Sequence, residues 1–238
     1  MDPRQYASFP RLTQRPFSSA LKRPTPILYA YSPSVLPKPS DWGAGVHVTG
    51  YWFSDAEGNW PPQDDLLHFL DSGPPPVYVG FGSTVSDAPS RLARIAIHAL
   101  EMAGTRGILG MDLGGVRKEE LPSTIFPVSD IPHSWLFPRM AAIVHHGGAG
   151  TGAGLRSGVP NVVVPFTSDQ PFWARRVHQL GAGPEPLPAR CLTSERLAAA
   201  IRTASHHEEM RRASSLLSVR INAERGVDRA VEIILREL

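Results

Sequence analysis

The stretch Val144–Gly154, VHHGGAGTGAG, packs two histidines and five glycines into eleven residues directly after an apolar run. Glycine lets the backbone approach a ligand closely, whereas a buried core gains little from it. The residues AAIVH (141–145) predict a strand, and GAGTGAGLRSG (148–158) predicts a helix that opens on glycines. A strand, a glycine-rich turn and a helix in this order present free N–H groups at a helix N-terminus, which favours an anion such as phosphate.

The chain around this turn alternates between short apolar runs and amphipathic runs. Strands are predicted at 77–83, 106–111, 123–128, 141–145 and 161–166. Helices are predicted at 91–104, 132–140, 148–158 and 170–181, with two or three more between 193 and 238. This alternation predicts an α/β fold, a Rossmann-like parallel sheet with helices on both faces. Ligands of such sheets bind at the carboxyl ends of the strands, where the glycine-rich turn lies.

Other interpretations of the turn are possible. No Lys-Ser or Lys-Thr follows the glycines, so it is not a Walker loop, and it follows a late strand rather than the first. A metal site at His145 and His146 is disfavoured, because adjacent side chains point apart and no third-ligand pattern follows. An ordinary tight turn remains an alternative. The next strand ends in TSDQ (167–170), whose polar side chains suit sugar hydroxyls but also suit capping of the following helix.

Composition narrows the class of protein. Lys plus Arg number 24 and Asp plus Glu number 22, and the net charge of +2 is too small to indicate nucleic acid as a partner. Cys191 is the single cysteine, so an internal disulfide is impossible. No apolar run reaches the length of a membrane span. We expect a soluble cytoplasmic protein, with peripheral membrane association as the alternative. The basic pair Arg211-Arg212 and the pair His206-His207 have acids interleaved and indicate a solvated face.

Several motifs resemble a known family. VTGYWF (48–53), VYVGFGS (77–83), IPHSWLFPRMAAIVHHGG (131–148) and AGLRSGVPNVVVPFTSDQPFWARRV (153–177) are similar to the C-terminal half of family 1 UDP-sugar glycosyltransferases. The most similar branch is that of the sterol 3-β-glucosyltransferases. The resemblance implies a GT-B fold, in which two Rossmann-like domains face each other across a cleft. Residues 1–76 would be the end of the acceptor domain plus a linker, and residues 77–238 the nucleotide-sugar donor domain.

The resemblance also assigns residues to the donor site. Contacts to the diphosphate are implied for Ser83, for His145 and for the backbone N–H groups of Gly147, Gly148, Ala149, Gly150 and Thr151. Val128 would meet the uracil through its backbone, and Asp169 and Gln170 would hold the sugar hydroxyls. Ala153 stands where plant members place a glutamate that contacts the ribose, so ribose recognition must differ here.

The implied reaction is an inverting transfer without a metal or cofactor. A hexose, with glucose favoured, would pass from a UDP-sugar such as UDP-glucose to a lipophilic alcohol such as a sterol. The acceptor domain and its catalytic base are expected to be absent from this chain, so no catalytic residue is assigned. The alternatives are a non-catalytic nucleotide-sugar-binding module and a regulatory fragment. Either would need a separate acceptor domain as a partner, and an exposed apolar face would favour self-association.

Overall fold

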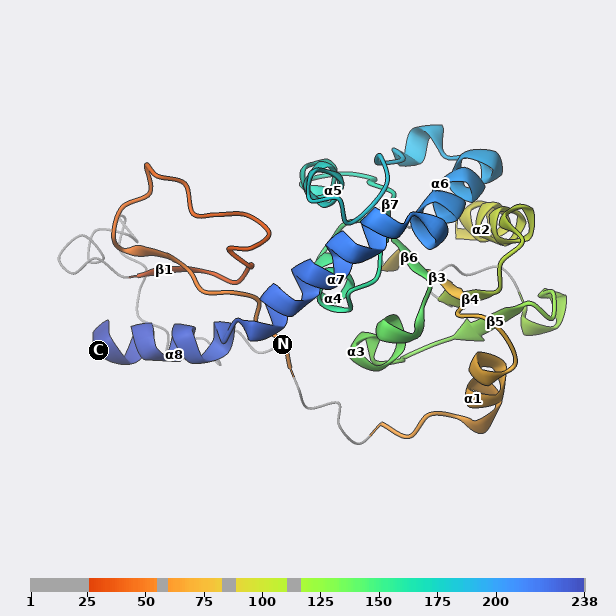
Figure 1. Cartoon of the computed structure of the whole chain (residues 1–238), viewed down its shortest axis with the longest axis horizontal. Coiled ribbons are helices and arrows are strands. Elements are labelled where there is room, and N and C mark those ends of the chain that lie inside the picture. The colour runs from red at the N-terminus through yellow and green to blue at the C-terminus, as the bar shows by residue number, and fades with distance from the viewer. Residues whose placement is uncertain (1–25, 55–59, 83–88, 111–116, 238) are drawn as a thin grey trace, which may run out of the picture.

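Five parallel strands form the central sheet of the structure (Figure 1). The structure is a computed structural model, and it describes residues 26–54, 60–82, 89–110 and 117–237. The strands lie in the order β5-β4-β3-β6-β7. Their bounds are β3 Val77–Val79, β4 Gly107–Gly110, β5 Ile125–Val128, β6 Ala142–His145 and β7 Asn161–Val163. Each neighbouring pair is parallel. The predicted α/β class and all five predicted strands are confirmed.

Alternating side chains bury the sheet on both faces. Val77 and Val79 pack on one face with helices α2 (Pro89–Ala103) and α6 (Ser194–His206). Tyr78, between them, packs on the other face with α1 (Asp64–Asp71) and α3 (His133–Leu136). Successive side chains of a strand point to opposite faces, so a strand buried on both sides must be apolar throughout.

A third apolar cluster covers β7 and the elements beside it. It joins α4 (Thr151–Arg156), α5 (Gln170–Gln179) and α7 (Glu208–Ala223) through side chains such as Leu155, Val177 and Leu217. The described part of the chain also contains the 3-10 helices η4 (Lys118–Glu120), η5 (Phe137–Arg139) and η6 (Ala189–Cys191). None of the helices in the described part of the chain combines the length and the apolar content that crossing a bilayer requires.

Two predicted helices differ from the structure in length. The helix predicted at 132–140 is divided into α3 and η5, because Pro138 has no N–H to donate to the preceding turn. The helix predicted at 148–158 shortens to the six residues of α4. It starts later because the residues before Thr151 form a tight turn, and it ends before Gly158, which has φ +77°.

Residues 26–54, here called the N-terminal segment, pack against the C-terminal end of the chain. Strands β1 (Ile27–Tyr29) and β2 (Val46–Val48) form a separate parallel pair, and α8 (Gly226–Glu237) extends beside them, away from the main sheet (Figure 1). Trp60 contacts Trp135, at 5.3 Å between ring centroids, and α1 packs on the main sheet. Part of residues 1–76 therefore packs on the predicted donor domain, while the proposed boundary at residue 76 stays a prediction.

Glu224, between α7 and α8, connects these two regions. Its Oε1 atom accepts hydrogen bonds from the hydroxyls of Ser32 (2.6 Å) and Ser34 (2.9 Å). The Ser32 hydroxyl is buried and also accepts the N–H groups of Ser34 and Val35. One carboxylate thus holds the turn after β1 against the end of α7.

We expect Glu224→Ala to destabilise the N-terminal segment by about 1–3 kcal/mol, because the Ser32 hydroxyl loses a charged acceptor. The measurement is amide hydrogen exchange, which should accelerate at residues 27–36 and stay unchanged in β3. Glu232→Ala is the control, since its exposed carboxylate makes only a 3.9 Å ion pair with Arg236. Equal protection of residues 27–36 in both variants would contradict this role of Glu224.

Candidate functional site

A cavity of about 580 Å³ lies at the carboxyl ends of β3, β4, β5 and β6. This is the edge of the sheet where a ligand was expected. Its wall is built mostly from residues at or after the ends of these strands. They are Gly80, Gly82, Gly110, Val128, Ser129, Asp130, His145, His146 and Gly150, with Tyr78, Ile131, His133 and Phe137. We call this space the donor cavity, since most of the predicted donor residues lie in or beside it.

His145 ends β6 and is buried, with 6% of its surface exposed. Its Nδ1 atom accepts the N–H of Gly147 at 3.0 Å, so the ring proton belongs on Nε2. The Nε2–H then donates to Oδ1 of Asn161, also at 3.0 Å. Both ring nitrogens are therefore engaged within the protein. The predicted bond from His145 to a phosphate stays a prediction, and it requires one of these two bonds to be exchanged.

Asn161 is fully buried at the start of β7 and extends the same chain of hydrogen bonds. Its amide nitrogen donates to the carbonyl of Val159 at 2.7 Å, which fixes the orientation of the amide and leaves Oδ1 facing His145. Gly154 passes so close to Asn161 that an added Cβ would overlap Oδ1. The glycine in α4 is thus required by the side chain that holds His145.

Burial keeps His145 neutral. The pKa of His145 is lowered from 6.5 to about 4, chiefly by loss of hydration; the nearby His146 and His133 contribute to the lowering, and the hydrogen bond to Asn161 opposes it. A neutral imidazole can accept the Gly147 N–H on Nδ1, whereas an imidazolium cannot. Burial lowers the pKa, and the neutral ring that results can make the hydrogen bond to Gly147 that the structure shows.

The loop Gly147–Thr151 exposes a run of backbone amides beside the donor cavity. Gly147 adopts φ +85°, and its N–H is taken by His145. Thr151 donates both its N–H (2.9 Å) and its hydroxyl (2.7 Å) to the carbonyl of Gly148. Among the residues that the structure describes, the N–H groups of Gly148, Ala149 and Gly150 meet no acceptor. Because α4 has only six residues, these three amides matter more for an anion than the helix dipole does.

Asp169 ends the loop from β7 to α5 and Gln170 is the first residue of α5, and neither residue lines the donor cavity. The backbone carbonyl of Gln170 lies 3.4 Å from where a Cβ of Gly147 would stand, so the two loops touch. The buried Gln170 side chain points inward, and its Oε1 accepts the N–H groups of Phe166 (2.8 Å) and Thr167 (3.2 Å). Asp169 is exposed and accepts the indole N–H of Trp173 at 2.9 Å. Their predicted contacts with sugar hydroxyls stay predictions.

The remaining assigned residues fall into two groups. Val128, at the end of β5, lines the donor cavity, and its contact with uracil stays a prediction. Ser83 lies outside the described residues. Among the described residues, no group of three or more His, Cys, Asp and Glu has the arrangement of a metal site. The expectation of a metal-free reaction rests on the family resemblance.

Sequence reasoning missed Asp130 and His133, which close the donor cavity after β5. Asp130 has φ +49°, a backbone conformation uncommon for residues other than glycine. His133 stacks on Phe137, with 4.2 Å between ring centroids and 13° between planes. The signal in the sequence was the short polar stretch after β5, since Asp130 and His133 lie two and five residues beyond its end at Val128.

The chain is similar in sequence to a known protein family and to several known proteins. Residues 112–232 match the family described as Erythromycin biosynthesis protein CIII-like, C-terminal domain. A sterol 3-beta-glucosyltransferase of Arabidopsis thaliana is 43% identical over 216 residues, which cover 90% of this chain and 35% of that protein. An O-mycaminosyltylonolide 6-deoxyallosyltransferase of Streptomyces fradiae is 43% identical over 222 residues, 91% of this chain and 51% of that protein. The chain thus spans about a third to a half of these relatives.

The fold has counterparts among solved structures. A crystal structure of the glycotransferase of kitacinnamycin superposes with a TM-score of 0.72 and 23% identity, over 90% of this chain and 55% of that one. At this level of identity the likeness shows the fold alone. It confirms the predicted arrangement, the C-terminal half of a GT-B fold.

The low pKa of His145 predicts acid sensitivity. In the unfolded chain this group takes up a proton near pH 6.5, but in the folded chain only near pH 4, so the unfolded state binds more protons in between. Stability should therefore fall as the pH drops from about 6.5 to about 4, by up to about 3 kcal/mol from this group. Urea unfolding at pH 7 and pH 4.5 measures it. His145→Gln should reduce the fall, whereas the control His98→Gln, at an exposed position of α2, should not. An equal fall in all three proteins would contradict it.

The contact between Gly154 and Asn161 predicts that substitutions at Gly154, inside α4, and at Gly150, just before α4, will differ sharply in their effect on stability. Gly154→Ala should destabilise the fold by about 1–3 kcal/mol, because the new Cβ displaces the Asn161 amide from His145. Gly150→Ala should change stability by less than about 0.5 kcal/mol, since a Cβ there meets nothing within 4 Å. Thermal and urea unfolding of both variants measure the difference, and similar values for the two would refute the crowding at Gly154.

Proposed function

The chain belongs to the family 1 glycosyltransferases as their C-terminal donor domain, and from this premise we propose that it binds a UDP-sugar in the donor cavity. Family membership makes it part of an enzyme that transfers a sugar. The observation that carries the proposal is the loop at Gly148, Ala149 and Gly150, whose amides meet no acceptor among the described residues, beside a cavity at the carboxyl ends of the strands. Backbone N–H groups that converge on one point bind the oxygens of a phosphate.

The parts of the donor molecule have candidate positions along the donor cavity. The diphosphate would lie against Gly148–Gly150, with His145 holding that loop in place. The base would lie beside Val128 and the ring of His133, and an aromatic ring suits stacking with a uracil. Asp130 offers carboxylate oxygens to the ribose hydroxyls, a role that Ala153 cannot fill.

The sugar would lie toward Asp169, whose exposed carboxylate can accept bonds from its hydroxyls. In the proposed inverting reaction the oxygen of the acceptor hydroxyl attacks the anomeric carbon. The bond from that carbon to the β-phosphate oxygen breaks, and the hydroxyl proton passes to a base supplied by the acceptor-binding part. The amides of Gly148–Gly150 would stabilise the negative charge that develops on the leaving UDP.

The acceptor is proposed to be a lipophilic alcohol such as a sterol, and the sugar to be glucose. Both rest on the relative from Arabidopsis thaliana, a sterol 3-beta-glucosyltransferase. The relative from Streptomyces fradiae has the same identity and is named for the transfer of a 6-deoxyallosyl group, so a deoxysugar is the second candidate. We place the reaction in the cytoplasm, at a membrane surface when the acceptor is a membrane lipid.

A further possibility is that the chain binds the donor without turnover unless an acceptor-binding part joins it. The apolar side chains Val227, Val231, Ile234 and Leu235 are 44–67% exposed on α8. Their spacing places them along one stripe of the helix. An exposed stripe of this kind favours either docking of an acceptor-binding part or self-association.

Calorimetric titration with UDP and with UDP-glucose, in the presence of EDTA, tests the donor site. We expect saturable, metal-independent binding of both ligands at one site. Binding of neither ligand by a folded chain would refute the proposal and leave a regulatory fragment as the function. Tighter binding of a thymidine diphosphate sugar would refute the choice of uridine while keeping the donor site.

Gly150→Asp tests the amide loop directly. Gly150 has φ −64° and no neighbour within 4 Å of an added Cβ, so the fold should accept the substitution. A carboxylate beside the diphosphate should weaken UDP binding at least about tenfold through charge repulsion. Gly45→Asp is the matched control, because Gly45 is exposed and equally open but remote from the donor cavity. Unchanged affinity in Gly150→Asp would remove this loop from the site.

A further inference from the structure

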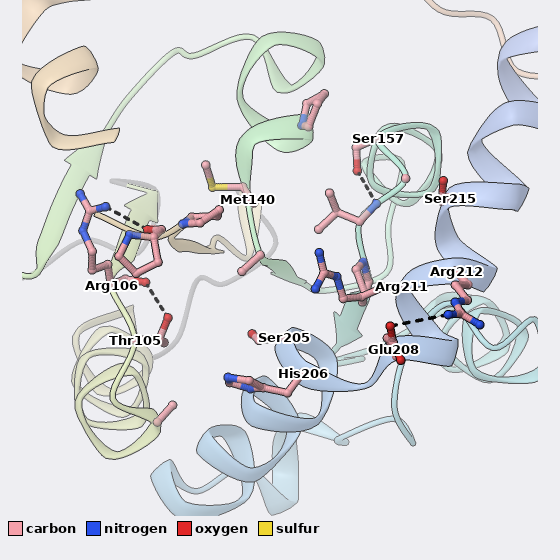
Figure 2. Close-up of a pocket in the computed structure, with 18 of the residues that line it drawn as sticks. Thr105, Arg106, Met140, Ser157, Ser205, His206, Glu208, Arg211, Arg212 and Ser215 are labelled. Atoms are coloured by element: carbon pink, nitrogen blue, oxygen red, sulfur yellow. Dashed lines mark hydrogen bonds and ion pairs between the residues drawn. The ribbon is translucent and has the colours of Figure 1, made fainter. Parts of the chain in front are cut away.

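A second cavity, of about 840 Å³, lies at the opposite edge of the main sheet. Its wall includes Arg106, Ala141 and Pro160, which directly precede β4, β6 and β7, and Pro75, which lies two residues before β3. The other side is formed by the corner between α6 and α7 (Figure 2). None of the assigned donor residues lines it. The second cavity is therefore separate from the donor cavity.

Arg211 reaches into the second cavity from α7 (Figure 2). The side chain is exposed, and it has no ion pair or side-chain hydrogen bond with any other residue in the described ranges. The sequence predicted a solvated face for Arg211, Arg212 and His206. All three residues are exposed, which confirms that prediction, and all three also line the second cavity.

Arg106 contributes a second guanidinium, and the protein holds it in place. It donates to the carbonyls of Pro74 (2.9 Å) and Phe69, and to the hydroxyl of Ser72 (3.1 Å). It also lies over the Phe69 ring, 4.2 Å from the centroid. A cation fixed by these contacts adds a permanent positive charge to one wall.

The carboxylates that line the second cavity do not neutralise its guanidinium groups. Glu208 is the one carboxylate among its lining residues, and it pairs with Arg212 at 3.6 Å. The two side chains are 79% and 74% exposed, so water screens this pair strongly. Three guanidinium groups against one carboxylate leave an excess of two positive charges, before any charge on His206 is counted.

Neutral hydrogen-bonding groups lie beside these charges. Ser205 lines the second cavity, and its hydroxyl oxygen is buried without a hydrogen-bond partner among the described residues. A buried hydroxyl without a partner is unfavourable, which suggests that a ligand or water completes it. His206 Nδ1 lies 3.0 Å from the carbonyl of Arg202, which leaves Nε2 as the free ring position.

We propose that the second cavity binds a phosphate monoester, with Arg211 as its principal contact. A phosphate monoester carries close to two negative charges at neutral pH, which matches the charge excess. Its three terminal oxygens accept the parallel N–H groups of guanidinium forks and the hydroxyl of Ser205. The ester can belong to a soluble metabolite or to a lipid headgroup, and the experiment below separates these sources.

Amide NMR of the 15N-labelled chain tests the proposal with glycerol phosphate as the probe, at constant ionic strength. Saturating UDP is included so that the donor cavity is filled, and the signals of Ser205–Ser215 report on the second cavity whether or not UDP binds. We expect saturable shifts in this segment. Arg211→Ala should weaken binding about tenfold or more, the loss of a charged hydrogen bond, and leave UDP affinity unchanged.

Arg220→Ala is the matched control, an exposed arginine on the same helix that does not line the second cavity. It should bind glycerol phosphate like the unmodified chain. Arg211→Lys should give an intermediate affinity, because it keeps the charge without the fork. Absence of saturable shifts, or equal affinity in Arg211→Ala and Arg220→Ala, would overturn the proposal.

Co-sedimentation with phosphatidylcholine vesicles distinguishes the two sources of the ester. Vesicles containing phosphatidic acid present a monoester, and vesicles containing phosphatidylglycerol present a diester. Binding of the first alone, lost in Arg211→Ala, assigns a lipid headgroup to the second cavity. Glycerol phosphate binding without vesicle binding assigns a soluble ester. Vesicle binding that Arg211→Ala does not alter, together with no response to glycerol phosphate, would overturn the proposal.

Discussion

The hydrogen bond between His145 and Asn161 is the interaction on which the candidate site depends. It joins the end of β6 to the start of β7, and it fixes the tautomer that lets His145 accept the Gly147 N–H. That bond supports Gly147 in a conformation that favours glycine. In the part of the chain that the structure describes, the amides of Gly148, Ala149 and Gly150 then meet no acceptor beside the donor cavity. The same bond explains why α4 needs glycine at position 154, where a larger residue would strike Asn161.

The parallel sheet gives the molecule two chemically different edges. All carboxyl ends of the strands meet at one edge, where glycines keep the backbone bare and the donor cavity forms. All amino ends meet at the other, where Arg106 and the α6–α7 junction surround the second cavity. The first edge offers neutral amides, and the second offers guanidinium groups. The two proposed sites for phosphate oxygens would thus be built by different chemistry in a protein of small net charge.

Local patterns predicted the regular elements well and the site in part. The five strands and the helices α2, α5 and α6 lie where apolar periodicity placed them, because each buries a face that is visible in its own sequence. The helix α4 is shorter than predicted, since Thr151 turns back on Gly148 through bonds that no periodicity reveals. Asp130 and His133 escaped notice because their importance comes from facing a cavity.

The sequence by itself determined the fold class, the position of the glycine-rich turn and the family. These depend on periodicity and on residue types close together in the chain. Only the tertiary structure decided that His145 is neutral and hydrogen-bonded through both ring nitrogens. It also decided that the Gln170 side chain faces inward and that Arg106 and Arg211 line the same cavity. Burial and hydrogen bonding set these properties, and both depend on partners that are distant in sequence and become neighbours only when the sheet and its helices assemble.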